Sequence, residues 1–247
     1  MDYNGRNAAV DENAGAAGIM AAPENQHKPA MPQSTLDQLA VPADVALWRL
    51  GIGDEALDMS GLSADEQVRC LRFLRPRDRI RFALTRSTLR RLLAGHLDCS
   101  PLDLAFILGP YGKPELQGGA PCFNVSHSHE YALIAIAGEA VGVDIERSDP
   151  SRDWPGIAAE ILDEREQALC ARDPAMFYQL WSAKEAVLKA WGWGLGYSAP
   201  SLAPQGGGFA VGLLGKPEAG TRVWNIDAGP GYAAALALGA CSLAHPV

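Results

Sequence analysis

The chain has 247 residues, of which 48% are hydrophobic, and its formal net charge is −8 at pH 7. This composition fits a globular protein that is long enough to bury the core of one large domain or two ordinary ones. The acidic balance argues against a nucleic-acid-binding protein, and no apolar run is long enough to span a bilayer. Because the N-terminus also lacks the pattern of a signal peptide, we expect a cytoplasmic protein without a membrane partner.

Five widely spaced cysteines form no C-x-x-C motif, which argues against a zinc site or dithiol chemistry. Without a secretion signal, such a set is typical of reduced, mostly structural thiols.

Residues 1–35 are rich in Ala, Gly, Asn, Pro and Gln, and we expect a disordered extension there. Alternating apolar residues predict a first strand at 44–52. A capping box that begins at Ser63 predicts a helix to about residue 75, stopped by Pro76. A second helix is expected over about 78–94, with Gly95 at its end.

The two helices contain an unusual concentration of arginine in an acidic protein. Nine of the 21 basic residues lie between positions 69 and 91, with Asp78 as the one acid among them. Such a block indicates a local anion site for a polyanionic small ligand or an acidic protein partner. A solvated helix face is the alternative, and it accounts for several of these arginines.

Short strands alternate with turns in the middle of the chain. Residues 104–108 predict a strand, and the turn-rich loop 109–114 presents Lys113. Two strongly apolar strands, 131–137 and 141–145, are separated by three residues and predict a hairpin.

Two acids end the second apolar strand. Asp144 and Glu146 are two positions apart, so their side chains point to the same side of the strand. Burying both carboxylates is costly without a cation, which indicates a divalent-metal site of the kind that Mg²⁺ forms with carboxylates, waters and phosphates. The alternative is a strand end that emerges into water.

The second half of the chain begins after a plausible linker at 150–155. A helix is expected at 157–171 and another at 181–191, where Glu185 and Lys189 lie one turn apart on one face. Taken alone, that pair is typical of an ordinary surface helix. The glycines at 192–196 follow a helix rather than a strand, which excludes a Rossmann nucleotide site.

Strands are expected at about 209–214, 222–227 and 232–238. The last of these resembles the strand at 131–137, and each ends a unit of helices followed by strands. This internal similarity favours two similar α+β halves with a ligand cleft at their interface.

Three blocks, in this order, resemble the Sfp-type 4′-phosphopantetheinyl transferases. The first is Tyr-Gly-Lys-Pro at 111–114 with Phe-Asn-Val-Ser-His-Ser at 123–128. The second is Val-Gly-Val-Asp-Ile-Glu at 141–146, and the third is Trp-Ser-Ala-Lys-Glu-Ala-Val-Leu-Lys at 181–189. Together they are specific to this family, and the resemblance covers roughly residues 45–240.

The resemblance implies two pseudo-symmetric α+β halves, 36–139 and 140–247, in a monomer with the active site between them. It also implies Mg²⁺-dependent transfer of the phosphopantetheine arm of coenzyme A to a serine of an apo acyl or peptidyl carrier protein. The second product is adenosine 3′,5′-bisphosphate. Which carrier is used stays open.

The resemblance also assigns residues. The metal-site acids are Asp144, Glu146 and Glu185. The coenzyme A contacts are Arg69, Arg81, Lys113, Ser126, His127, Asp144, Lys184 and Lys189, with His127 at the 3′-phosphate. The catalytic residues are Glu185, Lys189 and Glu146.

Elementary chemistry is consistent with these roles. Attack by a serine hydroxyl on the pyrophosphate needs charge neutralisation, in-line positioning and proton removal. Glu185 is the first candidate for the base and Glu146 the second, while Lys189 is placed to stabilise the departing phosphate. Two alternatives stay open: a non-catalytic module that binds coenzyme A or carrier proteins, and a metal-dependent phosphohydrolase.

Overall fold

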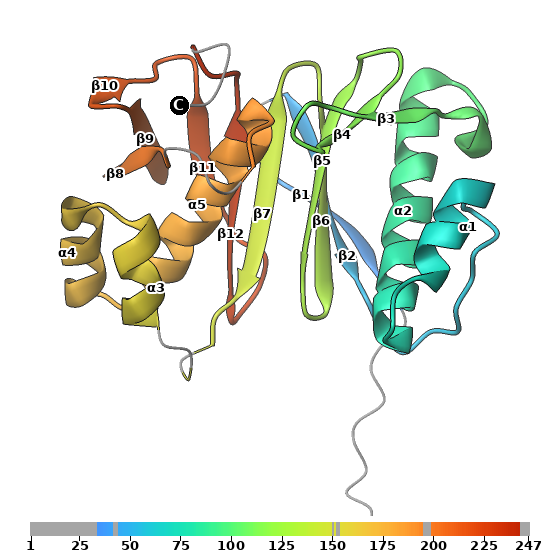
Figure 1. Cartoon of the computed structure of the whole chain (residues 1–247), viewed down its shortest axis with the longest axis horizontal. Coiled ribbons are helices and arrows are strands. Elements are labelled where there is room, and N and C mark those ends of the chain that lie inside the picture. Colours follow the sequence, from blue (N-terminus) through green and yellow to red (C-terminus); the bar gives the residue numbers. More distant parts are fainter. Residues whose placement is uncertain (1–33, 42–43, 150, 152–153, 195–198, 243–247) are drawn as a thin grey trace, which may run out of the picture. The chain divides into compact units, whose positions relative to one another are not determined.

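The computed structural model describes residues 34–41, 44–149, 151, 154–194 and 199–242. Residues 31–247 form one compact unit that combines helices with antiparallel sheets, as expected for the α+β class (Figure 1). Almost all of the predicted extension, residues 1–35, lies outside the described residues. None of the described helices is both long and apolar enough to cross a membrane.

The first sheet has the strand order β1-β2-β6-β5. Its strands are β1 (Leu36–Leu39), β2 (Val45–Gly51), β5 (Cys122–Ser128) and β6 (Tyr131–Ala137). Strand β2 matches the prediction at 44–52. Strand β1 is a mostly exposed edge strand of four residues, and its sequence shows no alternation that predicts it.

The second sheet has the order β10-β9-β11-β12-β7, and β8 pairs with β9. Its strands are β7 (Val141–Arg147), β8 (Ser201–Gln205), β9 (Gly208–Leu213), β10 (Lys216–Pro217), β11 (Arg222–Ile226) and β12 (Tyr232–Leu238). Strands β9, β11 and β12 confirm the three strands expected after the last helix. A separate two-stranded sheet joins β3 (Phe106–Leu108) to β4 (Pro114–Leu116), after a short 3₁₀ helix, η1 (Pro101–Asp103).

The hairpin predicted from β6 and β7 is wrong. Strand β6 pairs on one edge with β2 and on the other with β5, so neither edge is left for β7. Strand β7 pairs over its whole length with β12 in the other sheet. The connection at 138–140 therefore carries the chain from one sheet to the next. The boundary expected between residues 139 and 140 and the pseudo-symmetry of the two halves both stay predictions.

The first two helices begin and end differently from expectation. Helix α1 (Ala64–Leu71) has the predicted capping box, with Ser63 Oγ accepting from the backbone N–H of Glu66. Pro76 does not stop α1 but opens α2 (Pro76–Leu97), because a proline in the first turn removes no intrahelical hydrogen bond. Gly95 lies inside α2, and Asp98 takes the left-handed conformation after it, with φ of 49°.

The helix expected at 157–171 is two helices, α3 (Trp154–Ile161) and α4 (Glu164–Arg172). A second capping box, formed by Asp163 and Glu166, starts α4 and interrupts the apolar pattern. Helix α5 (Met176–Trp191) begins before the predicted residue 181 and ends, as predicted, at Gly192 in the left-handed conformation.

Helix α5 packs against β7 and β12 (Figure 1). Leu180, Val187 and Leu188 are buried in this contact. The backbones of β7 and α5 approach so closely at Gly142 that a Cβ there would lie 1.9 Å from the carbonyl oxygen of Ala186. Because residue 142 is a glycine, the backbone of α5 can pack directly on β7. This packing places the charged side of α5 next to the polar end of β7.

Candidate functional site

Two side chains from separate elements, Ser126 and Lys189, meet at the buried carboxylate of Asp144. Asp144 of β7 is 2% exposed. Its Oδ1 accepts hydrogen bonds from Ser126 Oγ of β5 at 2.7 Å and from Lys189 Nζ of α5 at 2.5 Å. Lys189 Nζ also donates to Ser126 Oγ at 3.1 Å, which closes the triangle. The structure thus brings together Ser126, Asp144 and Lys189, three of the residues expected at the site.

The second oxygen of Asp144 has no partner among the described residues. Oδ2 is buried and makes no hydrogen bond to any described residue. An unpartnered carboxylate oxygen in a buried position is energetically costly, unless a cation or a donor from a ligand completes it. This oxygen is therefore a free ligand position at the centre of the site.

Glu185 lies one helical turn before Lys189 on α5. Burial raises the pKa of Glu185, the nearby charge of Lys189 lowers it, and the charge of Asp144 raises it. The negative charge of Asp144 thus disfavours a second negative charge on Glu185. A cation between two such carboxylates would relieve this repulsion.

Glu146 is two residues beyond Asp144 on β7, and Ser128 Oγ donates to its Oε2 at 3.3 Å. Among the residues that the structure describes, no three His, Cys, Asp or Glu side chains are gathered closely enough to form a metal cluster. The ammonium group of Lys189 lies against Asp144, in the position where a cation would neutralise that carboxylate. The described structure therefore shows a lysine beside Asp144, and the metal site of Asp144, Glu146 and Glu185 stays a prediction.

A ladder of polar side chains on β5 bridges the two sheets. Strands β5 and β7 lie side by side without backbone pairing. Instead, Asn124 Oδ1 accepts from the N–H of Val143 at 2.9 Å, Ser126 bonds to Asp144, and Ser128 Oγ accepts from the N–H of Arg147 at 3.0 Å. Asn124 and Ser128 were not predicted as site residues, although polar residues at 124, 126 and 128 follow the period of one strand face.

His127 does not lie beside Asp144, because its side chain points to the opposite side of β5 from that of Ser126. It lines a cavity of about 180 Å³ together with Arg69 of α1 and Arg81 of α2. Burial lowers the pKa of His127, and the charges of Arg81 and Lys189 lower it further. Asp78 accepts from Arg81 at 2.7 Å and offsets part of this positive charge. The structure therefore gathers Arg69, Arg81 and His127 around a positively charged hollow.

The remaining arginines divide into buried and exposed ones. Asp78 is not the only counter-ion, because Glu66 of the capping box contacts Arg90 at 2.7 Å and Arg86 at 3.5 Å. Arg90 is 3% exposed and also donates to the carbonyl oxygens of Pro101 and Leu104, so it is a structural residue. The exposed arginines of the block are Arg72, Arg75, Arg77, Arg91 and the cavity-lining Arg69.

Lys113 lies at the start of β7 rather than beside Asp144. Its Nζ donates to the carbonyl oxygen of Val141 at 2.9 Å, and burial lowers its pKa. It lines a cavity of about 260 Å³ that also includes Trp191 and Gly192 at the end of α5. Trp191 itself is a packing residue, since its indole donates to Thr221 and its ring packs against Trp193.

Lys184 does not join either group. It is 5% exposed, its Nζ contacts Glu166 at 2.8 Å, and it donates to the carbonyl oxygen of Pro200 at 2.6 Å. Glu166 is fully buried and also accepts from the N–H of Leu202. These contacts tie α5 to α4 and β8, and we leave Lys184 out of the proposed binding site.

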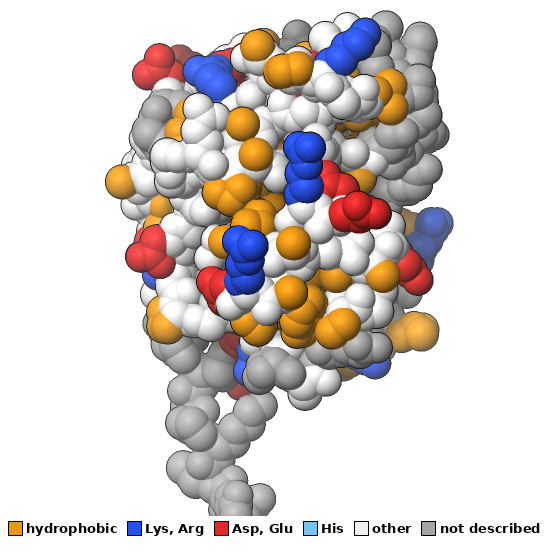
Figure 2. All heavy atoms as spheres, turned by 90° about the vertical axis from the view of Figure 1, so that its left-hand side faces the viewer, with side chains coloured by type: hydrophobic (Ala, Val, Ile, Leu, Met, Phe, Trp, Pro, Cys, Tyr) orange, Lys and Arg blue, Asp and Glu red, His pale blue; other side chains and the backbone are white. Residues whose placement is uncertain are grey.

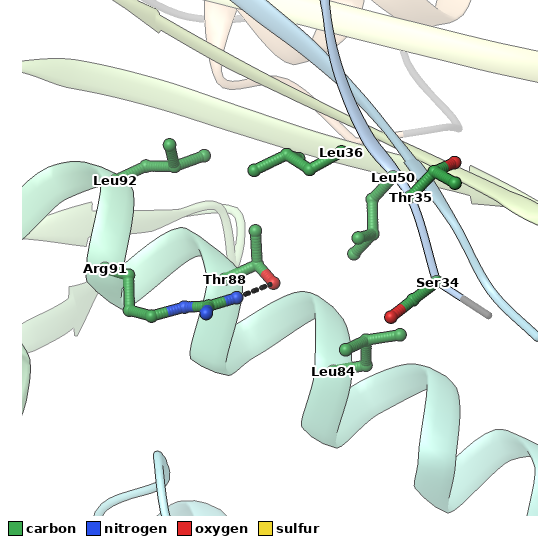
Figure 3. A pocket seen from close by; sticks show the side chains of 8 residues that line it. All are labelled: Ser34, Thr35, Leu36, Leu50, Leu84, Thr88, Arg91 and Leu92. Atoms are coloured by element: carbon green, nitrogen blue, oxygen red, sulfur yellow. Dashed lines mark hydrogen bonds between the residues drawn. The ribbon is translucent and has the colours of Figure 1, made fainter. Parts of the chain in front are cut away.

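A further cavity lies away from these groups. It measures about 450 Å³ and is lined by α2 and the β1–β2 edge, with Leu36, Leu50, Leu84 and Leu92 around Thr88 and Arg91 (Figure 3). Arg91 donates to Thr88 there at 3.1 Å. On the face of Figure 2, which includes α4, acidic and basic side chains are interspersed with hydrophobic ones. The concentration of arginine thus belongs to α1 and α2.

The chain is similar in sequence to known proteins. The profile of the 4′-phosphopantetheinyl transferase superfamily matches residues 140–234. A Synechocystis protein provisionally named a 4′-phosphopantetheinyl transferase is 37% identical over 179 residues, which are 68% of this chain and 72% of that protein. The 4′-phosphopantetheinyl transferase HetI of Nostoc is 34% identical, over 62% of this chain and 70% of its own. The 4′-phosphopantetheinyl transferase Sfp of Bacillus subtilis is 31% identical, over 56% of this chain and 63% of its own.

Proposed function

Since the chain belongs to the 4′-phosphopantetheinyl transferase superfamily, we propose that it moves the phosphopantetheine arm of coenzyme A to a serine of an apo acyl or peptidyl carrier protein. The observation that carries this proposal is the contact of Ser126, Asp144 and Lys189, with Glu185 one turn away and a basic cavity on the other side of β5. This arrangement offers acids, a cation and an anion-binding hollow within one region.

The reaction needs one proton transfer and one exchange of bonds at phosphorus. The serine oxygen of the carrier forms a bond to the phosphorus that carries the pantetheine arm, and the pyrophosphate P–O bond breaks. Adenosine 3′,5′-bisphosphate leaves with the electron pair of that bond, and the serine proton goes to a carboxylate of the enzyme.

Glu185 is the proposed base. The burial that raises its pKa also makes the carboxylate a stronger proton acceptor near neutral pH. Glu146 is the second candidate because it lies on the same side of β7 as Asp144. Lys189, already held between Ser126 and Asp144, places its positive charge where the departing phosphate gains negative charge.

We propose a divalent cation at this site, on the support of one buried carboxylate oxygen. Asp144 Oδ2 has no partner among the described residues, and Glu185 and Glu146 would supply the further carboxylate oxygens that Mg²⁺ prefers. When bound, Mg²⁺ would neutralise charge on the pyrophosphate. Ser126 and Lys189 keep Asp144 Oδ1 fixed, so that Oδ2 keeps its direction.

The nucleotide end of coenzyme A is assigned to the basic cavity. Arg69, Arg81 and His127 line it, and their charges suit a phosphate group. Lys113, which lines a separate cavity, is a further proposed contact of the nucleotide. We further propose a monomer of two pseudo-symmetric halves, 36–139 and 140–247, in which this site takes residues from both.

The test is to incubate the protein with coenzyme A, Mg²⁺ and a panel of apo carrier proteins from fatty-acid, polyketide and nonribosomal-peptide systems. Mass spectrometry should show at least one carrier gaining the mass of phosphopantetheine, and a chelator should abolish the gain. Binding of coenzyme A without transfer to any carrier would support a binding module instead. Release of adenosine 3′,5′-bisphosphate without any carrier would support a phosphohydrolase.

A further inference from the structure

Ser128 links the backbone of β7 to the side chain of one of its acids. It is the last residue of β5, and its Oγ accepts from the backbone N–H of Arg147 at 3.0 Å. The same Oγ donates to Glu146 Oε2 at 3.3 Å. A hydroxyl carries one proton and an ionised carboxylate carries none, so the proton of this second bond comes from the serine. One serine therefore holds two consecutive residues of β7.

The contact lies on the edge of β7 that faces β5. The other edge pairs with β12, where Glu146 lies opposite Ala233 and Arg147 opposite Tyr232. Strands β5 and β7 are not paired through their backbones, so the Ser128 hydroxyl supplies the acceptor that a strand would otherwise give to the N–H of Arg147. This bond fixes the hydroxyl oxygen relative to β7 and leaves its proton for Glu146.

Ser128 differs from the two other polar residues on this face of β5. Asn124 holds the backbone of β7 through the N–H of Val143, and Ser126 holds the carboxylate of Asp144. Ser128 combines both kinds of contact. Because it is tied to the strand itself, it can keep a carboxylate of that strand in one direction.

Glu146 has more need of such a restraint than Asp144. A glutamate has one more rotatable bond than an aspartate, and Glu146 is half-buried, whereas Asp144 is 2% exposed. Ordering a long side chain costs conformational entropy. A hydrogen bond that orders the carboxylate before substrates bind reduces the part of this cost that falls on the reaction.

We propose that Ser128 is a positioning residue, which holds the Glu146 carboxylate on the side of β7 that also presents Asp144. The inference rests on the proposed function, in which Glu146 is a candidate base and a candidate metal ligand. Ser128 acts only through Glu146 and is assigned no contact with coenzyme A or with the serine of the carrier. Its loss should therefore affect kcat more than the KM for coenzyme A.

The test compares Ser128→Ala and Ser128→Thr with the full-length wild type, using coenzyme A, Mg²⁺ and the apo carrier that wild type modifies best. Ser128→Ala should lower kcat about tenfold, as expected when one hydrogen bond to a charged group is lost. The KM for coenzyme A should stay near that of wild type, because other residues line the cavity assigned to its nucleotide end. Ser128→Thr keeps the hydroxyl on a residue that suits a strand, and it should restore most of the rate.

Ser87→Ala is the matched control. Ser87 is also half-buried, its hydroxyl donates to the carbonyl oxygen of Leu84 within α2, and its side chain lies beside Gly61. Ser87→Ala removes one hydroxyl and should change neither kcat nor KM, and thermal melting shows that each variant is folded. No loss of rate in Ser128→Ala, or an equal loss in Ser87→Ala, would overturn the proposal.

A double-mutant cycle tests whether Ser128 acts through Glu146. In a Glu146→Ala background, Ser128→Ala should slow transfer no further, because no carboxylate remains for the hydroxyl to hold. Losses that multiply would mean that Ser128 acts through the N–H of Arg147 instead, and would contradict the proposal.

Crystal structures of the same variants separate this proposal from the proposed function, because they need no turnover. The Glu146 carboxylate should have one conformation in wild type and in Ser128→Thr, and a different or divided one in Ser128→Ala, with Asp144 unmoved. An unchanged Glu146 in Ser128→Ala would contradict the positioning role even in a protein that transfers phosphopantetheine. The expected change in a protein that transfers nothing would support the positioning contact and contradict the proposed function alone.

Discussion

Asp144 is the residue on which the candidate site converges. One of its oxygens accepts from Ser126 and Lys189, and the other has no partner among the described residues. Asp144 is 2% exposed, and Lys189 is the cation that contacts it in the described structure. The free oxygen and the adjacent Glu185 then define where a further cation or a reacting phosphate belongs.

Lys184 and Lys189 are close in sequence, but we expect substitution of Lys184 to reduce stability and substitution of Lys189 to reduce transfer. Lys184→Met leaves the fully buried Glu166 without its cation, so we expect a loss of about 3–5 kcal/mol in the free energy of unfolding. The KM of the folded protein for coenzyme A should not change. Denaturant unfolding and steady-state kinetics check the two expectations, and Lys189→Met is the matched variant that should lose transfer. A raised KM in folded Lys184→Met would return Lys184 to the binding site.

His127 makes stability depend on pH. Its pKa in the folded protein lies below the ordinary value of 6.5, so the folded state binds this proton less readily than the unfolded state does. The contribution of neutral His127 to stability is present above pH 6.5 and is lost as the pH falls through its folded pKa. Thermal melts at pH 7.5 and pH 5.5 should show wild type losing more stability than His127→Gln. Equal losses would mean that the pKa is not lowered.

Helix α5 and strand β7 form the element pair that sets the geometry of the site. Gly142 allows their backbones to touch, and a Cβ there would lie 1.9 Å from Ala186 O and 2.4 Å from Ala190 N. Gly142→Ala must therefore push α5 away from β7, which we expect to cost about 1–3 kcal/mol of stability. Because Lys189 moves with α5, transfer should fall as well.

Gly138→Ala is the control for that variant. Gly138 lies in the connection just before β7, and a Cβ there would meet no atom within 4 Å. Denaturant unfolding should show a near-wild-type free energy for Gly138→Ala and a reduced one for Gly142→Ala. A Gly142→Ala protein with wild-type stability and transfer would mean that the close approach is not needed.

The sequence predicts the positions of the apolar strands better than it predicts which strands pair with one another. The patterns at 44–52, 131–137 and 232–238 each correspond to a strand, because alternating or buried apolar residues are a local signal. Pairing is not local, so the hairpin prediction for β6 and β7 fails although both strands exist. The sequence pattern predicts one helix at 157–171 instead of two. The reason is that the capping box of Asp163 and Glu166, which starts α4, lies within a continuous apolar pattern.

At the scale of the whole molecule, the site lies where two sheets of separate chain segments meet. Residues 36–137 supply the first sheet and residues 141–238 the second, and β5 and β7 are bridged by side chains instead of backbone bonds. The motifs name Ser126, Asp144, Glu185 and Lys189, but spacing alone does not place Lys189 on Asp144. That contact depends on the packing of α5 on β7.

The most direct test of the central claim compares wild type with Glu185→Gln. The apo carrier that wild type modifies best is incubated with coenzyme A and Mg²⁺, and its intact mass is followed over time. We predict that Glu185→Gln transfers at least about a hundredfold more slowly, as expected on removal of a general base, while calorimetry shows that coenzyme A still binds. Transfer at the wild-type rate by Glu185→Gln would contradict the assignment of the reaction to this site.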